Sequence, residues 1–139
     1  MANFSNSQMR FLLLSAILLT YIQTFAKKVE TLGGAVNTEY SEIHPLIAPD
    51  GQTLYFVRVS HPSNKFGKEG SNDVCFADLM SDKRWAVARK MPNTINKDRY
   101  NDLFSITPDG NTALIRGVYA NGRKTDEVGI SISKKKGTA

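Results

Sequence analysis

The feature that most constrains the fold of this chain of 139 residues is an internal repeat. The segments 36–58 and 95–117 align at a constant offset of 59 residues, and each contains the triplet Pro-Asp-Gly. A fixed period of this length is typical of a modular array in which each copy is one supersecondary unit. We therefore expect residues 27–139 to fold as two similar modules, at about 32–90 and 91–139, the second of them incomplete.

Each copy of the triplet predicts a tight turn. Proline presets a φ of about −65° at the second position of a type I turn, and glycine takes the positive φ that a side chain resists. Such a turn with a following glycine commonly joins the two strands of a β-hairpin. We therefore assign both aspartates to turn formation rather than to ligand binding. The turn residues are Pro49, Asp50 and Gly51 in the first copy and Pro108, Asp109 and Gly110 in the second.

Short β-prone runs flank each turn. The runs LYFV at 54–57 and ALI at 113–115 are continuously apolar rather than alternating, which predicts strands covered on both faces. A polar loop and a third strand follow in each copy, and the first copy has a candidate fourth strand around RWAVA at 84–88. Four antiparallel strands in a unit of about 40–60 residues form a β-propeller blade. The sequence therefore predicts an all-β fold made of antiparallel four-stranded propeller blades, about two in number.

The order of these motifs resembles the TolB-like, WD-repeat-like β-propeller repeat. That repeat has a Gly-Gly-x-Asp-Ile-Trp strand, a Lys-x-Gly-Lys-Trp turn and then an Ile-Asn pair. The segments DVCF at 73–76, KRW at 83–85 and IN at 95–96 stand at those places. The resemblance implies a repeat core that includes Trp85, Asn37 and Asn96, with a sugar-stacking platform as the alternative role of Trp85.

The resemblance also implies a cellular setting. Such repeats occur in exported proteins of Bacteroidetes-like bacteria, often ahead of an OmpA-family peptidoglycan-binding domain. The chain departs from the family at the tryptophan of the strand, which is Cys75 in the first copy and Gly129 in the second. Closed propellers take about 4–8 blades, so we expect a piece of a longer propeller protein or an assembly of short chains. Open blade edges would then favour self-association.

The first 26 residues have the composition of a secretory signal peptide. Arg10 is their only charge, FLLLSAILL at 11–19 is a short apolar core, and Thr24 and Ala26 are small residues of a cleavage site. We expect a cleaved signal-peptide helix at 1–26, with an uncleaved anchor helix or a buried helix as alternatives. The predicted location is the periplasm or the outer-membrane-associated cell envelope, with membrane contact only through this segment if it stays attached.

The net charge bears on whether the chain binds nucleic acid, and the cysteine content on whether it forms disulfides. The formal net charge of +5 is spread out, and SKKKG at 133–137 is the only long basic run. An exported chain without a basic stripe interleaved with aromatic residues does not predict nucleic-acid binding. Cys75 is the single cysteine, so no internal disulfide can form, and we interpret it as a small buried hydrophobe, with a reactive thiol as the alternative.

No motif in the sequence predicts catalysis or a metal centre. His44 and His61 have no Cys or His neighbour at the spacing of zinc ligands, and no Gly-x-Ser-x-Gly elbow occurs. Paired carboxylates precede each turn, and we interpret them as turn and salt-bridge residues, with a calcium site as the alternative. We therefore predict no enzyme activity, no metal and no cofactor. The carboxylate pairs are Glu39 with Glu42 and Asp98 with Asp102.

Two functions fit these observations. The first is a non-catalytic exported repeat module that binds an envelope protein or a cell-wall component as a scaffold. The second is a propeller fragment of an exported hydrolase, a peptidase or a carbohydrate-active enzyme, whose catalytic residues lie outside this chain. The repeats and the lack of a catalytic motif favour the first.

Overall fold

The computed structural model describes residues 29–135 of the chain. The chain divides into two units, Met1–Thr31 and Leu32–Ala139. Of the first unit only residues 29–31 are described, as exposed coil, so the predicted signal peptide at 1–26 lies outside the described residues. Among the residues that are described, no helix is long and apolar enough to cross a membrane.

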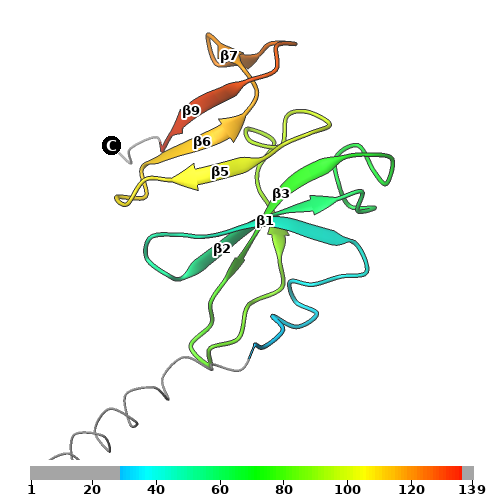
Figure 1. Cartoon of the computed structure of the whole chain (residues 1–139), viewed down its shortest axis with the longest axis vertical. Coiled ribbons are helices and arrows are strands. Elements are labelled where there is room, and N and C mark those ends of the chain that lie inside the picture. Colours follow the sequence, from blue (N-terminus) through cyan, green and yellow to red (C-terminus); the bar gives the residue numbers. More distant parts are fainter. Residues whose placement is uncertain (1–28, 136–139) are drawn as a thin grey trace, which may run out of the picture. The chain divides into compact units, whose positions relative to one another are not determined.

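The first sheet is a four-stranded antiparallel meander, in which each strand pairs with the next one along the chain (Figure 1). The pairing of β2 with β3 runs without a break, whereas β1 carries an irregularity between Ile43 and Leu46. The strands are β1 (Ser41–Ile47), β2 (Thr53–Val59), β3 (Asn72–Asp78) and β4 (Arg89–Lys90).

The second sheet is antiparallel and has the strand order β5-β6-β9. A small hairpin of β7 and β8 lies in the connection between β6 and β9. Because strands are the only regular elements in residues 29–135, the predicted all-β fold class is confirmed. The strands are β5 (Leu103–Ile106), β6 (Thr112–Arg116), β7 (Tyr119–Ala120), β8 (Arg123–Lys124) and β9 (Ile130–Lys134).

The two Pro-Asp-Gly turns have the same backbone geometry. Gly51 and Gly110 both have a φ of +70°. The Gly51 N–H donates to the Ala48 carbonyl and the Gly110 N–H donates to the Thr107 carbonyl, both at 2.8 Å. The first turn joins β1 to β2 and the second joins β5 to β6, so each triplet closes a hairpin as its chemistry predicts.

Replacing either turn glycine with valine should destabilise the protein. We expect Gly51→Val and Gly110→Val each to lower the free energy of unfolding by about 1 kcal/mol or more, because a β-branched residue resists positive φ. An added Cβ meets no atom within 4 Å at either site, so the loss comes from the backbone and not from a clash. Urea denaturation followed by circular dichroism measures it. Gly34→Val is the control, because Gly34 has equal space and no positive φ, and an equal loss there would contradict the argument.

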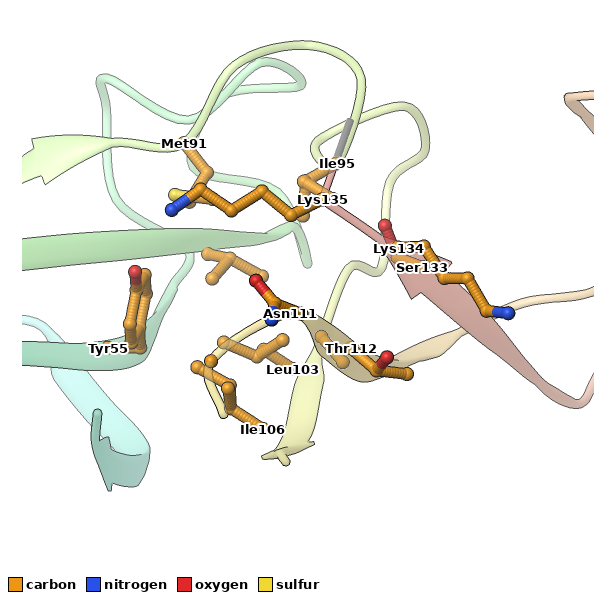
Figure 2. Close-up of a pocket in the computed structure, with 13 residues that line it drawn as sticks. Tyr55, Met91, Ile95, Leu103, Ile106, Asn111, Thr112, Ser133, Lys134 and Lys135 are labelled. Atoms are coloured by element: carbon orange, nitrogen blue, oxygen red, sulfur yellow. The ribbon is translucent and has the colours of Figure 1, made fainter. Parts of the chain in front are cut away.

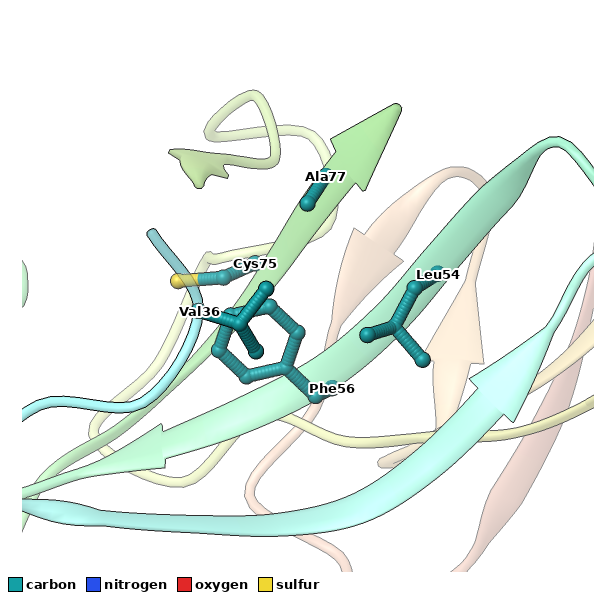
Figure 3. Close-up of a cluster of buried hydrophobic side chains, with 5 residues drawn as sticks. All are labelled: Val36, Leu54, Phe56, Cys75 and Ala77. Atoms are coloured by element: carbon teal, nitrogen blue, oxygen red, sulfur yellow. The ribbon is translucent and has the colours of Figure 1, made fainter. Parts of the chain in front are cut away.

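The first sheet is covered on both faces. On one face a buried cluster forms around β2 and β3, with Trp85 and Ala88 packed against it (Figure 3). On the other face Val57 and Val74 pack against Leu103 and Ile115 of the second sheet, and we call these four residues the inter-sheet cluster. The prediction that LYFV is a doubly covered strand is therefore correct for β2. The first cluster consists of Val36, Leu54, Phe56, Cys75 and Ala77.

The same prediction is wrong for ALI in β6. Ile115 is buried, but the neighbouring Leu114 is 37% exposed. Leu114 pairs with Ile132 of β9, which is 63% exposed. The inter-sheet cluster covers only one face of the second sheet, and no described residue buries the other face. A continuous apolar run therefore did not require burial on both sides.

The fourth strand of the first module lies later than predicted. Trp85 forms only an isolated antiparallel bridge with Leu79, and β4 is the pair Arg89–Lys90. The ladder beside β3 is interrupted because the pairing shifts by one residue between the Leu79–Trp85 bridge and the Phe76–Arg89 pair. RWAVA is thus the approach to the strand, and the strand itself follows it.

Candidate functional site

Two adjoining hollows open between the Pro-Asp-Gly turns. One, of about 380 Å³, is lined by both turns, including Pro49, Asp50, Pro108 and Asp109. The other, of about 280 Å³, runs inward between the sheets. We call the two hollows together the turn groove. The residues that line both hollows are Tyr55, Ile106, Gly110 and Lys135.

The inner end of the turn groove is apolar. It ends on side chains of the inter-sheet cluster, so the groove is continuous with the core (Figure 2). Tyr55 comes from β2 in the first sheet and Ile106 comes from the end of β5 in the second. The apolar lining comprises Val74, Met91, Ile95, Leu103, Ile106 and Ala113.

The outer rim of the turn groove is polar and cationic. Asn111 and Thr112 follow the second turn, and Ser133, Lys134 and Lys135 lie at the end of β9. In Figure 2 the Lys135 side chain reaches across the hollow toward Met91. In the same view the Lys134 side chain points away from the hollow, so the groove combines an apolar floor with hydrogen-bonding groups and one ammonium group, that of Lys135, at its rim.

The two turn aspartates are engaged in their own turns. Asp50 accepts a hydrogen bond from the Gln52 N–H at 2.8 Å. Asp109 accepts one from the Thr107 hydroxyl at 2.5 Å and one from the Asn111 N–H at 3.0 Å. These two hydrogen bonds lower the pKa of Asp109 below its ordinary value, and the bond from the Thr107 hydroxyl is the larger cause. Both carboxylates thus lie where the triplet chemistry places them, as acceptors within the turn.

Tyr55 is the aromatic group of the groove. Burial raises the pKa of its phenol, and the charges of Asp50 and Asp78 raise it further. The hydroxyl therefore stays protonated at neutral pH and can donate or accept a hydrogen bond.

Of the three residues assigned to the repeat core, Asn96 is the most buried. It is 1% exposed, and its carboxamide accepts from the Val74 N–H at 2.8 Å. It also donates to the Val74 carbonyl at 3.0 Å and to the Met91 carbonyl at 2.9 Å. Asn96 thereby ties the segment before β5 to strand β3 of the first sheet.

The other two core assignments have different surroundings. Trp85 is half-buried and packs against the first cluster. Asn37, the counterpart of Asn96 in the first copy, is exposed, and its N–H donates to the Gly33 carbonyl at 2.9 Å. Asn96 lies against a strand of the preceding module, whereas the described residues before Asn37 contain no strand.

A histidine–aspartate pair links the two sheets. His44 lies at the irregularity of β1 with a φ of +51°, and its Nδ1 is 2.7 Å from Oδ2 of Asp102, just before β5. The His44 side chain is 55% exposed and the Asp102 side chain only 6%. The sequence showed each residue, but no signal in it indicated that they meet, because they are 58 positions apart.

Of the remaining carboxylates of the paired sets, Glu42 and Asp98 have partners in the folded chain. Oε1 of Glu42 lies 3.3 Å from Nε of Arg58 and accepts from the Thr38 hydroxyl at 2.6 Å. Asp98 forms an ion pair with Lys124. These contacts fit the interpretation of the pairs as salt-bridge and turn residues.

The described residues offer no grouping for metal chemistry. Between residues 29 and 135, no set of three or more His, Cys, Asp or Glu side chains could hold a metal ion. Cys75 is 1% exposed, and burial is the largest cause of a rise in its pKa to about 11. Its thiol is therefore protonated and inaccessible, which makes it a poor nucleophile.

No family model, curated protein or solved structure matches this chain.

Proposed function

We propose that this protein is a non-catalytic exported module of TolB-like β-propeller repeats, and that it binds a polypeptide of the cell envelope. The observation that carries the proposal is the turn groove, an apolar hollow with a cationic rim between two equivalent turns. Pockets of this kind, with few polar groups around an apolar floor, are the usual form of a binding site.

The repeat architecture supports the propeller part of the proposal. The first module is a four-stranded antiparallel meander, which is the form of a propeller blade. The second module starts with an equivalent hairpin, and its inner face packs on the face of the first sheet. Face-to-face stacking of successive modules is how repeat architectures build a continuous core.

The chemistry of the groove indicates the class of partner. An apolar floor suits an aliphatic side chain, and the Lys135 ammonium group at the rim suits a carboxylate close to it. Asn111, Thr112 and Ser133 offer hydrogen-bonding groups beside them. We propose a polypeptide in which an aliphatic residue is followed by acidic residues.

Binding is tested with a pair of synthetic peptides and isotope-labelled protein. An acetylated peptide Leu-Leu-Glu-Glu should shift the backbone amide resonances of Asn111 and Ser133, and the peptide Leu-Leu-Lys-Lys should not. Lys135→Glu should weaken binding about 2- to 5-fold, because an exposed charge pair contributes up to about 1 kcal/mol. Lys83→Glu, an exposed lysine of the β3–β4 turn, is the control. Equal shifts with both peptides would refute the proposed groove chemistry.

A propeller fragment of an exported hydrolase is the second candidate. The observation that favours it is the exposed His44 ring held by the buried Asp102 carboxylate, an arrangement that also orients catalytic histidines. Among the described residues no Ser, Thr or Cys side chain hydrogen-bonds to His44, so a nucleophile would come from outside them. Mass spectrometry of the incubated peptides tests the peptidase form of this candidate, since a peptidase shortens them and a binding module leaves them intact.

A further inference from the structure

Strand β9 has a free edge. Within residues 29–135 its only neighbour is β6 (Figure 1). The Gly129 carbonyl accepts from the Gly117 N–H at 2.7 Å, and the Lys135 N–H donates to the Asn111 carbonyl at 2.8 Å. Because hydrogen-bonding direction alternates along an antiparallel strand, the intervening even-numbered residues point their backbone groups away from β6. Those residues are Ile130, Ile132 and Lys134.

The same strand presents apolar side chains to solvent. Ile130 is 62% exposed and Ile132 is 63% exposed. Ile132 pairs with Leu114 of β6, which is also exposed, so the apolar surface extends across two strands. An edge that combines unpaired backbone groups with exposed isoleucines is a template for pairing with another strand.

A negative and a positive side chain lie at equal distances along the sequence from Ser131 of β9. Glu127 lies four residues before Ser131, and Lys135 lies four residues after it. Both side chains are exposed, and neither has an ion-pair partner among residues 29–135. A second copy of the same strand, running antiparallel, would bring each of these charges opposite its complement.

We propose that two copies of this chain associate by pairing β9 with β9 across a two-fold axis at Ser131. Ile130 then lies opposite Ile132 of the second copy, and both present backbone groups at the free edge, so they form a hydrogen-bonded pair. Glu127 lies opposite Lys135 of the second copy, and the symmetry produces this ion pair twice. The inference goes beyond the proposed binding function and does not depend on it. The two share Lys135, whereas Glu127 lies outside the turn groove, so Glu127→Lys tests the dimer alone.

The charges select this register over its neighbours. Moving the axis to Ile132 places Ile130 opposite Lys134 and removes Lys135 from Glu127. Moving it to Ile130 places Ile132 opposite Val128 and Glu127 opposite Ser133, again without an ion pair. In the proposed register the four isoleucines form two cross-strand pairs on one face, and such pairs are the unit of sheet stabilisation. The interface is self-complementary, so association closes at a dimer.

A single introduced cysteine tests the register. Ser131 faces its own copy across the axis in a pair without hydrogen bonds, where Cα atoms lie about 4.5 Å apart, within disulfide range. Ser131→Cys should therefore give a covalent dimer on mild oxidation of the full chain. Ser133→Cys is the control, because its two copies would lie about 14 Å apart along the paired strands. The native Cys75 is buried and its thiol protonated, so it should add no cross-link.

Charge reversal gives an independent test that needs no new disulfide. Sedimentation equilibrium of the full chain should show a species of twice the 15.4 kDa chain mass. Glu127→Lys and Lys135→Glu should each weaken dimerisation at least tenfold, because each places like charges opposite one another twice. The double variant Glu127→Lys/Lys135→Glu should restore it, with circular dichroism to establish that all variants fold. A chain that stays monomeric, a double variant no better than the single ones, or a cross-link at position 133 instead of 131 would overturn the proposal.

Discussion

Asn96→Ala should lower the free energy of unfolding by about 3 kcal/mol or more. The substitution removes the carboxamide partner of the Val74 N–H and of the Met91 carbonyl, whereas the Val74 carbonyl, which Asn96 also contacts, still accepts from the Met91 N–H at 2.9 Å. Asn96 is 1% exposed, so water does not readily replace the lost bonds. Each buried polar group left without a partner costs about 1–3 kcal/mol. Urea denaturation followed by circular dichroism gives the difference from the midpoint and slope.

The repeat supplies a matched control. Asn37 stands at the equivalent place of the first copy, and it is exposed. Asn37→Ala should lower the free energy of unfolding by less, because water replaces the contacts that an exposed carboxamide loses. Two variants with the same chemistry at equivalent positions should therefore differ in their effect, with the larger loss at Asn96. Similar losses at both positions would show that the carboxamide bonds of Asn96 are not what stabilises the second module.

The parts of this fold that could be predicted from the sequence depend on local chemistry. A Pro-Asp-Gly triplet determines its own turn, since each residue restricts φ and ψ without reference to the rest of the chain. The hairpins and the all-β class follow from those turns and the flanking β-prone runs. The position of β4 depends on a one-residue shift in its pairing with β3, and no pattern around RWAVA indicated that shift.

The turn groove could not be predicted for a related reason. Each of its walls was recognised as a turn, but the hollow exists only because two turns 59 residues apart lie on either side of Tyr55 and Ile106. The His44–Asp102 pair and the carboxamide bonds of Asn96 likewise join the two modules across long separations in sequence. The repeat in the sequence predicted two similar modules. The contacts between the modules depend on how the folded chain places them, which the repeat does not specify.

Leu103→Ala should destabilise the protein by about 2–5 kcal/mol, the range for removing a leucine from a packed core. Leu103 begins β5 and is 6% exposed, and it belongs to the cluster that packs the second sheet on the first through Val57 and Val74. The cavity left behind would open toward the turn groove, which Leu103 also lines. Peptide binding at the groove should therefore weaken together with stability.

Leu114→Ala is the control for Leu103→Ala, because it removes the same apolar side chain from a position outside the packed core. Leu114 lies in the adjacent strand β6, but its side chain is on the outer face and 37% exposed. Replacing Leu114 with alanine should lower the free energy of unfolding by about 1 kcal/mol or less, because its side chain buries less apolar area than that of Leu103. A loss at Leu114 as large as at Leu103 would mean that the outer face is also buried in solution. Because such burial requires a covering partner, that loss should then fall as the protein is diluted, as expected for stability linked to association.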